Sequence, residues 1–352
     1  ATIMSINSNL AQEIQEQPQA LNRLLDTQAE AIQHLAEAIQ HRQITHIVIA
    51  ARGSSDNAAR YALYLFGTIN QFLVTLAAPS LYSLYKRPPR LGNVLVLGIS
   101  QSGESPDLVE VLAEARQQGA LTAAMTNISE SPLAQQADHV INLSAGVERS
   151  IAATKTYTAE LLALAMLSSQ LAANESMLTT LRLVPQWVEQ TFELNPNIYQ
   201  TIKPYCQMRR CIVIGRGYNY STAFELALKL KELTYTLVEP YSSADFLHGP
   251  SALIEPGFPI VVIAVSGPIL NEMQQDLMPL LIERGAEIIT LGNDPQTLSQ
   301  AQTTLPLPND IPEWLSPICA IVPGQLFALY IATMRGYDVD QPRGLKKVTK
   351  TQ

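Results

Sequence analysis

Residues 47–55 read Ile-Val-Ile-Ala-Ala-Arg-Gly-Ser-Ser, a short apolar run that ends in a polar turn. Residues 94–105 read Val-Leu-Val-Leu-Gly-Ile-Ser-Gln-Ser-Gly-Glu-Ser and have the same form. Residues 121–127 and 140–146 repeat it. An uninterrupted apolar run is typical of a strand that is buried on both faces of a parallel sheet. Since helical stretches separate these runs, the sequence predicts an α/β fold with helices on both faces of a parallel sheet.

The second half of the chain repeats the first. Three segments correspond in order: residues 212–217 with 47–53, 260–265 with 94–99, and 292–293 with 126–127. Matches in the same order at similar spacing are the signature of an internal duplication. We therefore expect two tandem doubly wound parallel-sheet domains.

The duplication and the segments on either side of it predict the domain boundaries. N-terminal helices, two in number, are expected in residues 1–43, with Pro18 near the start of the second. The first domain is expected in residues 44–180, a connector in 181–203, the second domain in 204–338 and a C-terminal tail in 339–352.

Composition narrows the class of protein. The chain has 352 residues, of which 47% are hydrophobic and 15% charged, as in a soluble globular protein. A net charge of −8 argues against a broad nucleic-acid surface. We find no apolar run long enough to cross a bilayer and no secretion signal, which predicts a cytoplasmic protein without a membrane partner. The spacing of Cys206, Cys211 and Cys319 predicts buried or half-buried free thiols and no metal site.

Two polar loops are candidates for phosphate binding. Ser54 and Ser55 follow the first strand, and a longer loop with four candidates follows the next apolar run, namely Ser100, Gln101, Ser102 and Ser105. Ligands of open parallel sheets lie beyond the carboxyl ends of the strands, where hydroxyls and helix N-termini can hold an oxyanion. Taken singly, Ser54 or Ser105 is more simply a helix cap or turn residue. Two such loops on successive strands favour a ligand, and no dinucleotide or P-loop fingerprint is present.

Acid and base candidates lie in the second half. Glu225, Lys229 and Glu232 fall three or four residues apart on one helical face. A solvated ladder of salt bridges is the simpler interpretation for Glu225. Residues 239–250 are expected to form a structured loop that carries His248. A carboxylate suits proton transfer between sugar carbons and a histidine suits ring opening, so Glu232 and His248 are the candidates.

Six segments carry a resemblance to a known family: 52–57 (RGSSDN), 100–107 (SQSGESPD), 150–157 (SIAATKTY), 228–232 (LKLKE), 243–250 (SADFLHGP) and 340–349 (DQPRGLKKVT). Over essentially its whole length the chain resembles the SIS (sugar isomerase) domain family, whose domains are flavodoxin-like. It looks most like the isomerase part of glucosamine-6-phosphate synthase (glutamine–fructose-6-phosphate aminotransferase) and the stand-alone glucosamine-6-phosphate deaminases of the second type.

The resemblance implies substrate-binding roles. The loop residues Ser100, Gln101, Ser102 and Ser105 would grip the phosphate. Ser54, Ser55, Ile151 and Ala153 would line the sugar. In the tail, Lys347 would close over the sugar, with Lys346 as the alternative.

It also implies catalytic roles. Glu232 would move a proton between C1 and C2, with Lys229 near the reacting carbons. His248 would open the ring from the neighbouring subunit, so a homodimer with a shared active site is implied.

The sequence departs from the synthase in two respects. It begins at Ala1 with no glutaminase domain, which argues against glutamine-dependent synthesis. Its Ala-Ala-Thr-Lys run and its Ser-Ala-Asp-Phe-Leu-His loop look more like the deaminase branch, and Ala153 stands where the synthase has a serine.

We therefore expect an amino-sugar-phosphate deaminase/isomerase that converts glucosamine 6-phosphate to fructose 6-phosphate and ammonia, without a metal or organic cofactor. Alternatives are an isomerase for another phosphosugar (a fructosamine, ketoamine, galactosamine or tagatose phosphate) and a synthase-like aminotransferase that lacks its glutaminase domain. A non-catalytic sugar-phosphate sensor is a third, which would predict an attached DNA-binding module.

Overall fold

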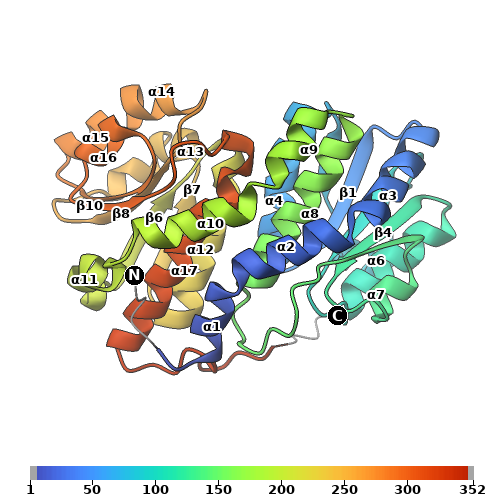
Figure 1. Ribbon diagram of the computed structural model, residues 1–352, viewed down its shortest axis with the longest axis horizontal. Coiled ribbons are helices and arrows are strands. Elements are labelled where there is room, and N and C mark those ends of the chain that lie inside the picture. Colours follow the sequence, from blue (N-terminus) through green and yellow to red (C-terminus); the bar gives the residue numbers. More distant parts are fainter. Residues whose placement is uncertain (1–5, 348–352) are drawn as a thin grey trace. The chain divides into compact units, whose positions relative to one another are not determined.

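The structure, a computed structural model, describes residues 6–347, which divide into two units (Figure 1). Within that range the N-terminal unit comprises residues 16–148, 153–185 and 346–347. The C-terminal unit comprises residues 6–15, 149–152 and 186–345. Each unit contains one five-stranded parallel sheet with helices around it, so the predicted α/β fold with two tandem parallel sheets is confirmed.

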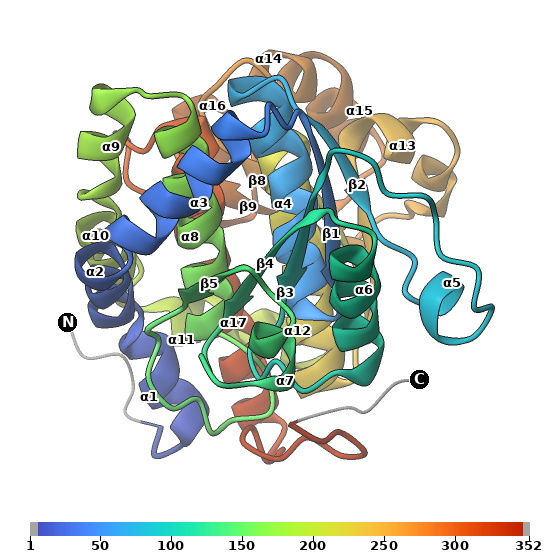
Figure 2. The same ribbon diagram turned by 90° about the vertical axis from the view of Figure 1, so that its right-hand side faces the viewer.

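The sheet of the N-terminal unit has the strand order β2-β1-β3-β4-β5 (Figure 2). Its strands are β1 (His46–Ala51), β2 (Leu73–Leu76), β3 (Leu95–Ile99), β4 (Leu121–Thr126) and β5 (His139–Asn142). All pairs are parallel, and Ala51 at the end of β1 lies opposite Ile99 at the end of β3. The loops that follow these two strands therefore start side by side.

Helices cover this sheet. They are α2 (Gln17–Thr27), α3 (Ala29–His41), α4 (Ser54–Ile69), α5 (Ser80–Ser83), α6 (Pro106–Gln117), α7 (Pro132–Gln135), α8 (Lys155–Leu171) and α9 (Glu175–Leu181). Val48 and Val96 pack against Leu108 and Leu112 of α6. Ile49, which points to the opposite face, is also buried, and α4 contacts β1, β3 and α8. Burial on both faces explains why β1 and β3 are continuous apolar runs.

The sheet of the C-terminal unit has the strand order β10-β9-β8-β6-β7, which matches the first sheet strand for strand. Its strands are β6 (Arg210–Ile214), β7 (Leu237–Tyr241), β8 (Pro259–Ala264), β9 (Glu287–Gly292) and β10 (Thr303–Pro306). β6 takes the place of β1, β8 that of β3 and β9 that of β4. The internal duplication is thereby confirmed.

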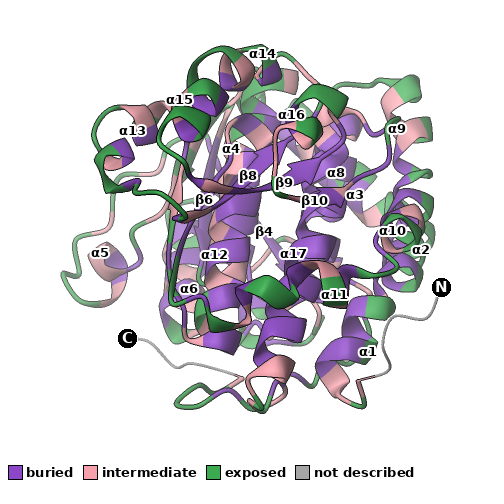
Figure 3. Cartoon of the chain, turned by 90° about the vertical axis from the view of Figure 1, so that its left-hand side faces the viewer, coloured by how far each residue is buried: buried purple, intermediate pink, exposed green. Residues whose placement is uncertain are grey.

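The helices of this unit include the long buried helix α17. They are α1 (Asn9–Gln15), α10 (Val184–Leu194), α11 (Ile198–Ile202), α12 (Tyr220–Thr234), α13 (Ser243–Leu247), α14 (Leu270–Glu272), α15 (Met278–Glu283), α16 (Pro295–Ser299) and α17 (Ser316–Met334). Residues 313–334 are long and apolar enough to cross a membrane, so the expectation that no such run exists was wrong. The whole apolar window of that segment is buried inside its unit, where α17 packs against α12 (Figure 3).

Three other predictions from the sequence can be compared with the structure. Residues 9–41 form three helices instead of two, because the chain also breaks at Gln28, between α2 and α3, and Pro18 does lie at the start of α2. The segment expected to be a loop at residues 239–250 contains the end of β7 and all of α13. Cys211 and Cys319 are buried free thiols and Cys206 is half-buried, as expected.

Candidate functional site

The loop from Ser100 to Ser105 joins the end of β3 to the start of α6. Gly103 gives this loop its shape, because its φ of +64° is a left-handed conformation. A Cβ atom at this position would lie 2.1 Å from the Oγ atom of Ser131. Only glycine therefore fits both the backbone conformation and the space.

The serine hydroxyls of this loop have different partners. Ser100 Oγ accepts a hydrogen bond from the Gly103 N–H at 3.1 Å, and Ser102 Oγ accepts one from the Glu104 N–H at 3.3 Å. Ser105 is the N-cap of α6, but its side chain makes no capping hydrogen bond. Ser105 is thus a helix cap, as the simpler interpretation has it, but its hydroxyl takes no part in the capping.

An ion pair joins the loop after β1 to the helix that follows β3. Arg52 donates from Nε at 2.9 Å and from Nη2 at 2.8 Å to Oδ2 of Asp107, in the first turn of α6. The Asp107 side chain is fully buried, whereas that of Arg52 is 48% exposed. The pair fixes the two loops to each other and leaves part of a guanidinium accessible beside them. Neither residue was among the site residues predicted from the sequence.

Ser54 and Ser55 begin α4 directly after Gly53. Ser55 is buried and donates from Oγ to Oε1 of Glu160 in α8 at 2.7 Å. Its hydroxyl thus holds α4 against α8, and Ser54 is the more exposed residue of the pair.

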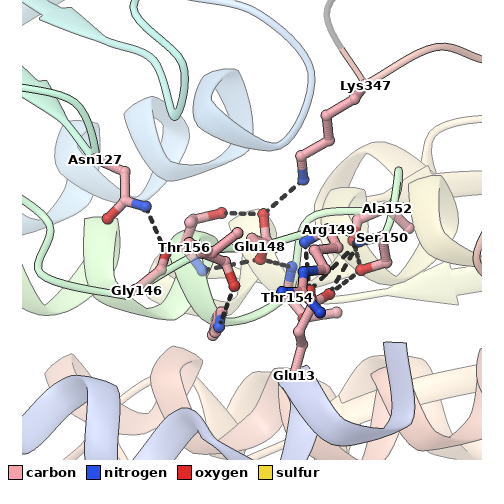
Figure 4. Close-up of polar contacts among 12 residues, drawn as sticks. Glu13, Asn127, Gly146, Glu148, Arg149, Ser150, Ala152, Thr154, Thr156 and Lys347 are labelled. Atoms are coloured by element: carbon pink, nitrogen blue, oxygen red, sulfur yellow. Dashed lines mark hydrogen bonds and ion pairs between the residues drawn. The ribbon is translucent and has the colours of Figure 1, made fainter. Parts of the chain in front are cut away.

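A buried carboxylate organises the loop between β5 and α8. Glu148 accepts hydrogen bonds from the Thr154 N–H at 2.9 Å, the Thr156 N–H at 3.2 Å and Thr156 Oγ1 at 2.8 Å (Figure 4). The Nζ atom of Lys347 lies 2.9 Å from Glu148 Oε2. Glu148 was not predicted from the sequence, because one acidic residue in a loop forms no recognisable pattern.

The sugar-lining candidates of this loop fall in different units. Ala153 is half-buried in the N-terminal unit, next to Thr154. Ile151 belongs to the C-terminal unit, where its N–H donates to the Asp340 carbonyl at 3.4 Å. In the same unit, Glu13 of α1 accepts hydrogen bonds from the Arg149 N–H and the Ser150 hydroxyl (Figure 4).

The C-terminal tail is held within the C-terminal unit as far as residue 345. The Asp340 carboxylate accepts hydrogen bonds from the N–H groups of Asn9 and Leu10 at the start of α1. The Arg343 guanidinium lies 4.0 Å from the ring centre of Tyr235. Residues 346–347 then belong to the N-terminal unit, and residues 348–352 of the predicted tail lie outside the described residues.

The acid and base candidates of α12 do come together. Lys229 Nζ lies 2.5 Å from Glu232 Oε2 and 3.5 Å from Glu225 Oε1. The side chains of Lys229 and Glu225 are 1% and 0% exposed, so the interpretation of Glu225 as part of a solvated ladder was wrong. Glu232 is 21% exposed and is the member of the cluster that a ligand can reach.

His248 directly follows α13 and is exposed. Among the described residues of this unit, its side chain makes no hydrogen bond with Glu232. Donation of His248 by a neighbouring subunit stays a prediction. In residues 6–347, no three His, Cys, Asp or Glu side chains are grouped so as to hold a metal ion.

The fold and these loops define an α/β protein with a polar loop at the strand ends of its first sheet. Residues 41–169 and 205–335 each match the SIS domain, and the chain belongs to the SIS domain family, as expected from its motifs. It is 34% identical over 96% of its length to the glutamine–fructose-6-phosphate aminotransferase of Thermus thermophilus, but spans only 58% of that protein.

Two solved structures share the fold and match the chain over nearly its whole length. A proposed phosphosugar isomerase from Silicibacter pomeroyi is 30% identical, with a TM-score of 0.84, and the match covers 95% of our chain and all of that one. The C-terminal domain of the Francisella tularensis glucosamine–fructose-6-phosphate aminotransferase is 26% identical, with a TM-score of 0.85, 97% of our chain and all of that domain being covered. The chain is thus related to enzymes of sugar-phosphate isomerisation.

Proposed function

We propose that this protein is an amino-sugar-phosphate deaminase/isomerase, which converts glucosamine 6-phosphate to fructose 6-phosphate and ammonia. The observation that carries the proposal is the Ser100–Ser105 loop, which places hydroxyls and a helix N-terminus at the carboxyl end of the central strand β3. Such an arrangement is suited to an oxyanion.

Phosphate binding would rest on groups that are available in this loop. The Ser105 side chain makes no capping bond, and Gln101, Ser102 and Ser105 are all partly exposed. Because the protein as a whole is acidic, the phosphate must be held by local donors and not by the overall field. Arg52 adds a partly exposed positive charge beside the loop.

The chemistry would use the cluster on α12. After His248 opens the ring, Glu232 takes the proton from C2 and returns it to C1 through an enolamine. The resulting C2 imine adds water and releases ammonia, leaving the ketone of fructose 6-phosphate. Lys229 holds Glu232 in place and offers a positive charge near the developing enolate oxygen. A homodimer that shares its active sites, and a cytoplasmic location, belong to the same proposal.

A second candidate is an isomerase that works as the corresponding part of an aminotransferase. The 34% identity to the Thermus thermophilus aminotransferase favours it. It would make glucosamine 6-phosphate from fructose 6-phosphate with ammonia supplied by another source, so the two candidates differ in the favoured direction and donor.

A substrate panel separates these candidates. The protein is mixed with glucosamine 6-phosphate, galactosamine 6-phosphate, a fructosamine phosphate or tagatose 6-phosphate, and ammonia and ketose phosphate are followed. We expect ammonia release from glucosamine 6-phosphate and none from unphosphorylated glucosamine. Ser102→Ala should raise KM about tenfold with a smaller effect on kcat, since a ground-state contact is lost. Binding without turnover of any member of the panel would instead indicate a sensor.

A further inference from the structure

Glu148 forms a charged link between the C-terminal tail and the loop that precedes α8 (Figure 4). Its side chain is fully buried, and Lys347, its cationic partner, is 26% exposed. Its other donors are the N–H groups of Thr154 and Thr156 and the Thr156 hydroxyl, at the start of α8. Thr154 is the N-cap of α8 but makes no side-chain capping bond, so Glu148 takes over that role.

The contacts of Glu148 allow Lys347 to move away while the loop that precedes α8 keeps its structure. The three hydrogen bonds from residues 154 and 156 come from the same segment of chain as Glu148 and satisfy both carboxylate oxygens. Lys347 is the second residue of the segment that follows the C-terminal unit, which ends at Leu345. The ion pair therefore ties Lys347 to the loop, while the hydrogen bonds from Thr154 and Thr156 hold the Glu148 carboxylate independently of it.

The same loop is joined to the candidate phosphate loop by Asn127. The Asn127 N–H donates to the Gln101 carbonyl at 3.1 Å. Its side chain donates to the Gly146 carbonyl at 2.7 Å and accepts from the Ala145 N–H at 3.0 Å. A continuous path of hydrogen bonds and backbone thus runs from Gln101 through Asn127 and the 145–148 segment to Lys347, all within the N-terminal unit.

We propose that Glu148 is a positioning residue, which holds the Lys347 ammonium in register with the Ser100–Ser105 loop so that it meets a phosphosugar bound there. The inference rests on the proposed function. Asn127 is the second part of the device, because it fixes the distance between the phosphate loop and the Glu148 loop.

A double-mutant cycle tests the link. Glu148→Gln keeps the size of the side chain and removes its charge. We expect it to lower kcat/KM for glucosamine 6-phosphate about tenfold in the wild-type background but less than about threefold in a Lys347→Met background, since the two residues act through one contact. Equal losses in both backgrounds would show that Glu148 only supports the fold, and would overturn the proposal.

A matched control is Glu16→Gln. Glu16 pairs with Lys155, which begins α8, at 2.7 Å, so this change also removes one carboxylate from an ion pair at the same end of the helix. Because the Lys347 ammonium pairs with Glu148, the effect of Glu16→Gln on kcat/KM should be the same in both backgrounds. If Glu148→Gln does not fold, Asn127→Ala takes its place in the cycle, with the same expected dependence on Lys347.

Amine labelling tests the contact without any turnover. Lys347 is modified with an amine reagent and followed by peptide mass spectrometry, with its exposed neighbour Lys346 as the internal standard. We expect Lys347 to react about fivefold faster, relative to Lys346, in Glu148→Gln than in the wild type, because the ion pair shields the amine. An unchanged rate would overturn the proposal. Labelling that responds in a protein inert toward every phosphosugar would leave the link standing and refute the proposed function alone.

Discussion

The ammonium of Lys229 lies 2.5 Å from a carboxylate oxygen of Glu232, one helical turn further along α12. Glu225, on the preceding turn, supplies a second carboxylate at 3.5 Å. Lys229 and Glu225 are both buried, and the Lys229 ammonium pairs with both carboxylates. The helix thus presents the partly exposed carboxylate of Glu232 above the buried ion pair of Lys229 and Glu225.

Removal of the lysine should destabilise the protein strongly. Lys229→Met leaves Glu225 buried without this cation, and we expect the free energy of unfolding in urea to fall by about 3–5 kcal/mol. The double variant Lys229→Met/Glu225→Leu should recover most of the loss. Lys231→Met, on the exposed side of the same helix, is the control and should change little. Wild-type stability of Lys229→Met would contradict this view of the cluster.

Gly103→Ala should distort the candidate phosphate loop. The new Cβ atom would overlap Ser131, and alanine would also have to adopt the left-handed backbone conformation of Gly103. Together these two effects should lower the free energy of unfolding by about 2 kcal/mol or more. Gly119, at φ +82° after α6, has no neighbouring atom within 4 Å of the place that a Cβ atom would take, so Gly119→Ala should lose only the backbone part, about 1 kcal/mol. Equal losses for the two variants, measured by thermal melts, would mean that the contact with Ser131 is unimportant.

The sequence predicted the fold well where burial was complete. β1, β3 and β8 are almost entirely apolar because both of their faces are covered. The edge strand β7 carries Pro240 and a half-exposed pattern, so its sequence favoured a loop. The break at Gln28 was missed because neither Gly nor Pro marks it.

The candidate site was predictable only in part. Regular spacing brought Lys229 and Glu232 to notice, and the two serine loops stood at the ends of apolar runs. Glu148 and Asn127 are single polar residues whose partners are distant in sequence, such as Lys347 for Glu148. Glu225 was misjudged because spacing gives the face of a helix and not what covers that face.

Asp294 should give the protein an acid-sensitive helix cap. It caps α16, and although burial opposes its charge, hydrogen bonds from Thr297 and Gln274 lower the pKa of its carboxyl below the ordinary value of 3.8. A lowered folded-state pKa stabilises the protein above the unfolded-state pKa, and this contribution is lost as pH falls through the folded-state value. Asp294→Asn should therefore melt at a lower temperature than wild type at neutral pH, and the difference should disappear in acid. A difference that grows below pH 3.8 would refute the assignment.

The thiols should differ in reactivity. Burial raises the pKa of the Cys211 thiol to about 12 and that of Cys319 even further, so neither forms a thiolate at ordinary pH. Cys206 is only half-buried. A chromogenic disulfide reagent should modify Cys206 in the native protein and all three cysteines after denaturation. Rapid native modification of Cys211 or Cys319 would show that the core around them opens.

The central claim is that Glu232 carries the proton between two carbons of a bound amino-sugar phosphate. The most direct measurement is the steady-state formation of fructose 6-phosphate from glucosamine 6-phosphate by Glu232→Gln beside the wild type. Loss of the transferring carboxylate should lower kcat about a thousandfold, while KM stays within a few fold because the phosphate loop is intact. Turnover by Glu232→Gln at the wild-type rate would contradict the account.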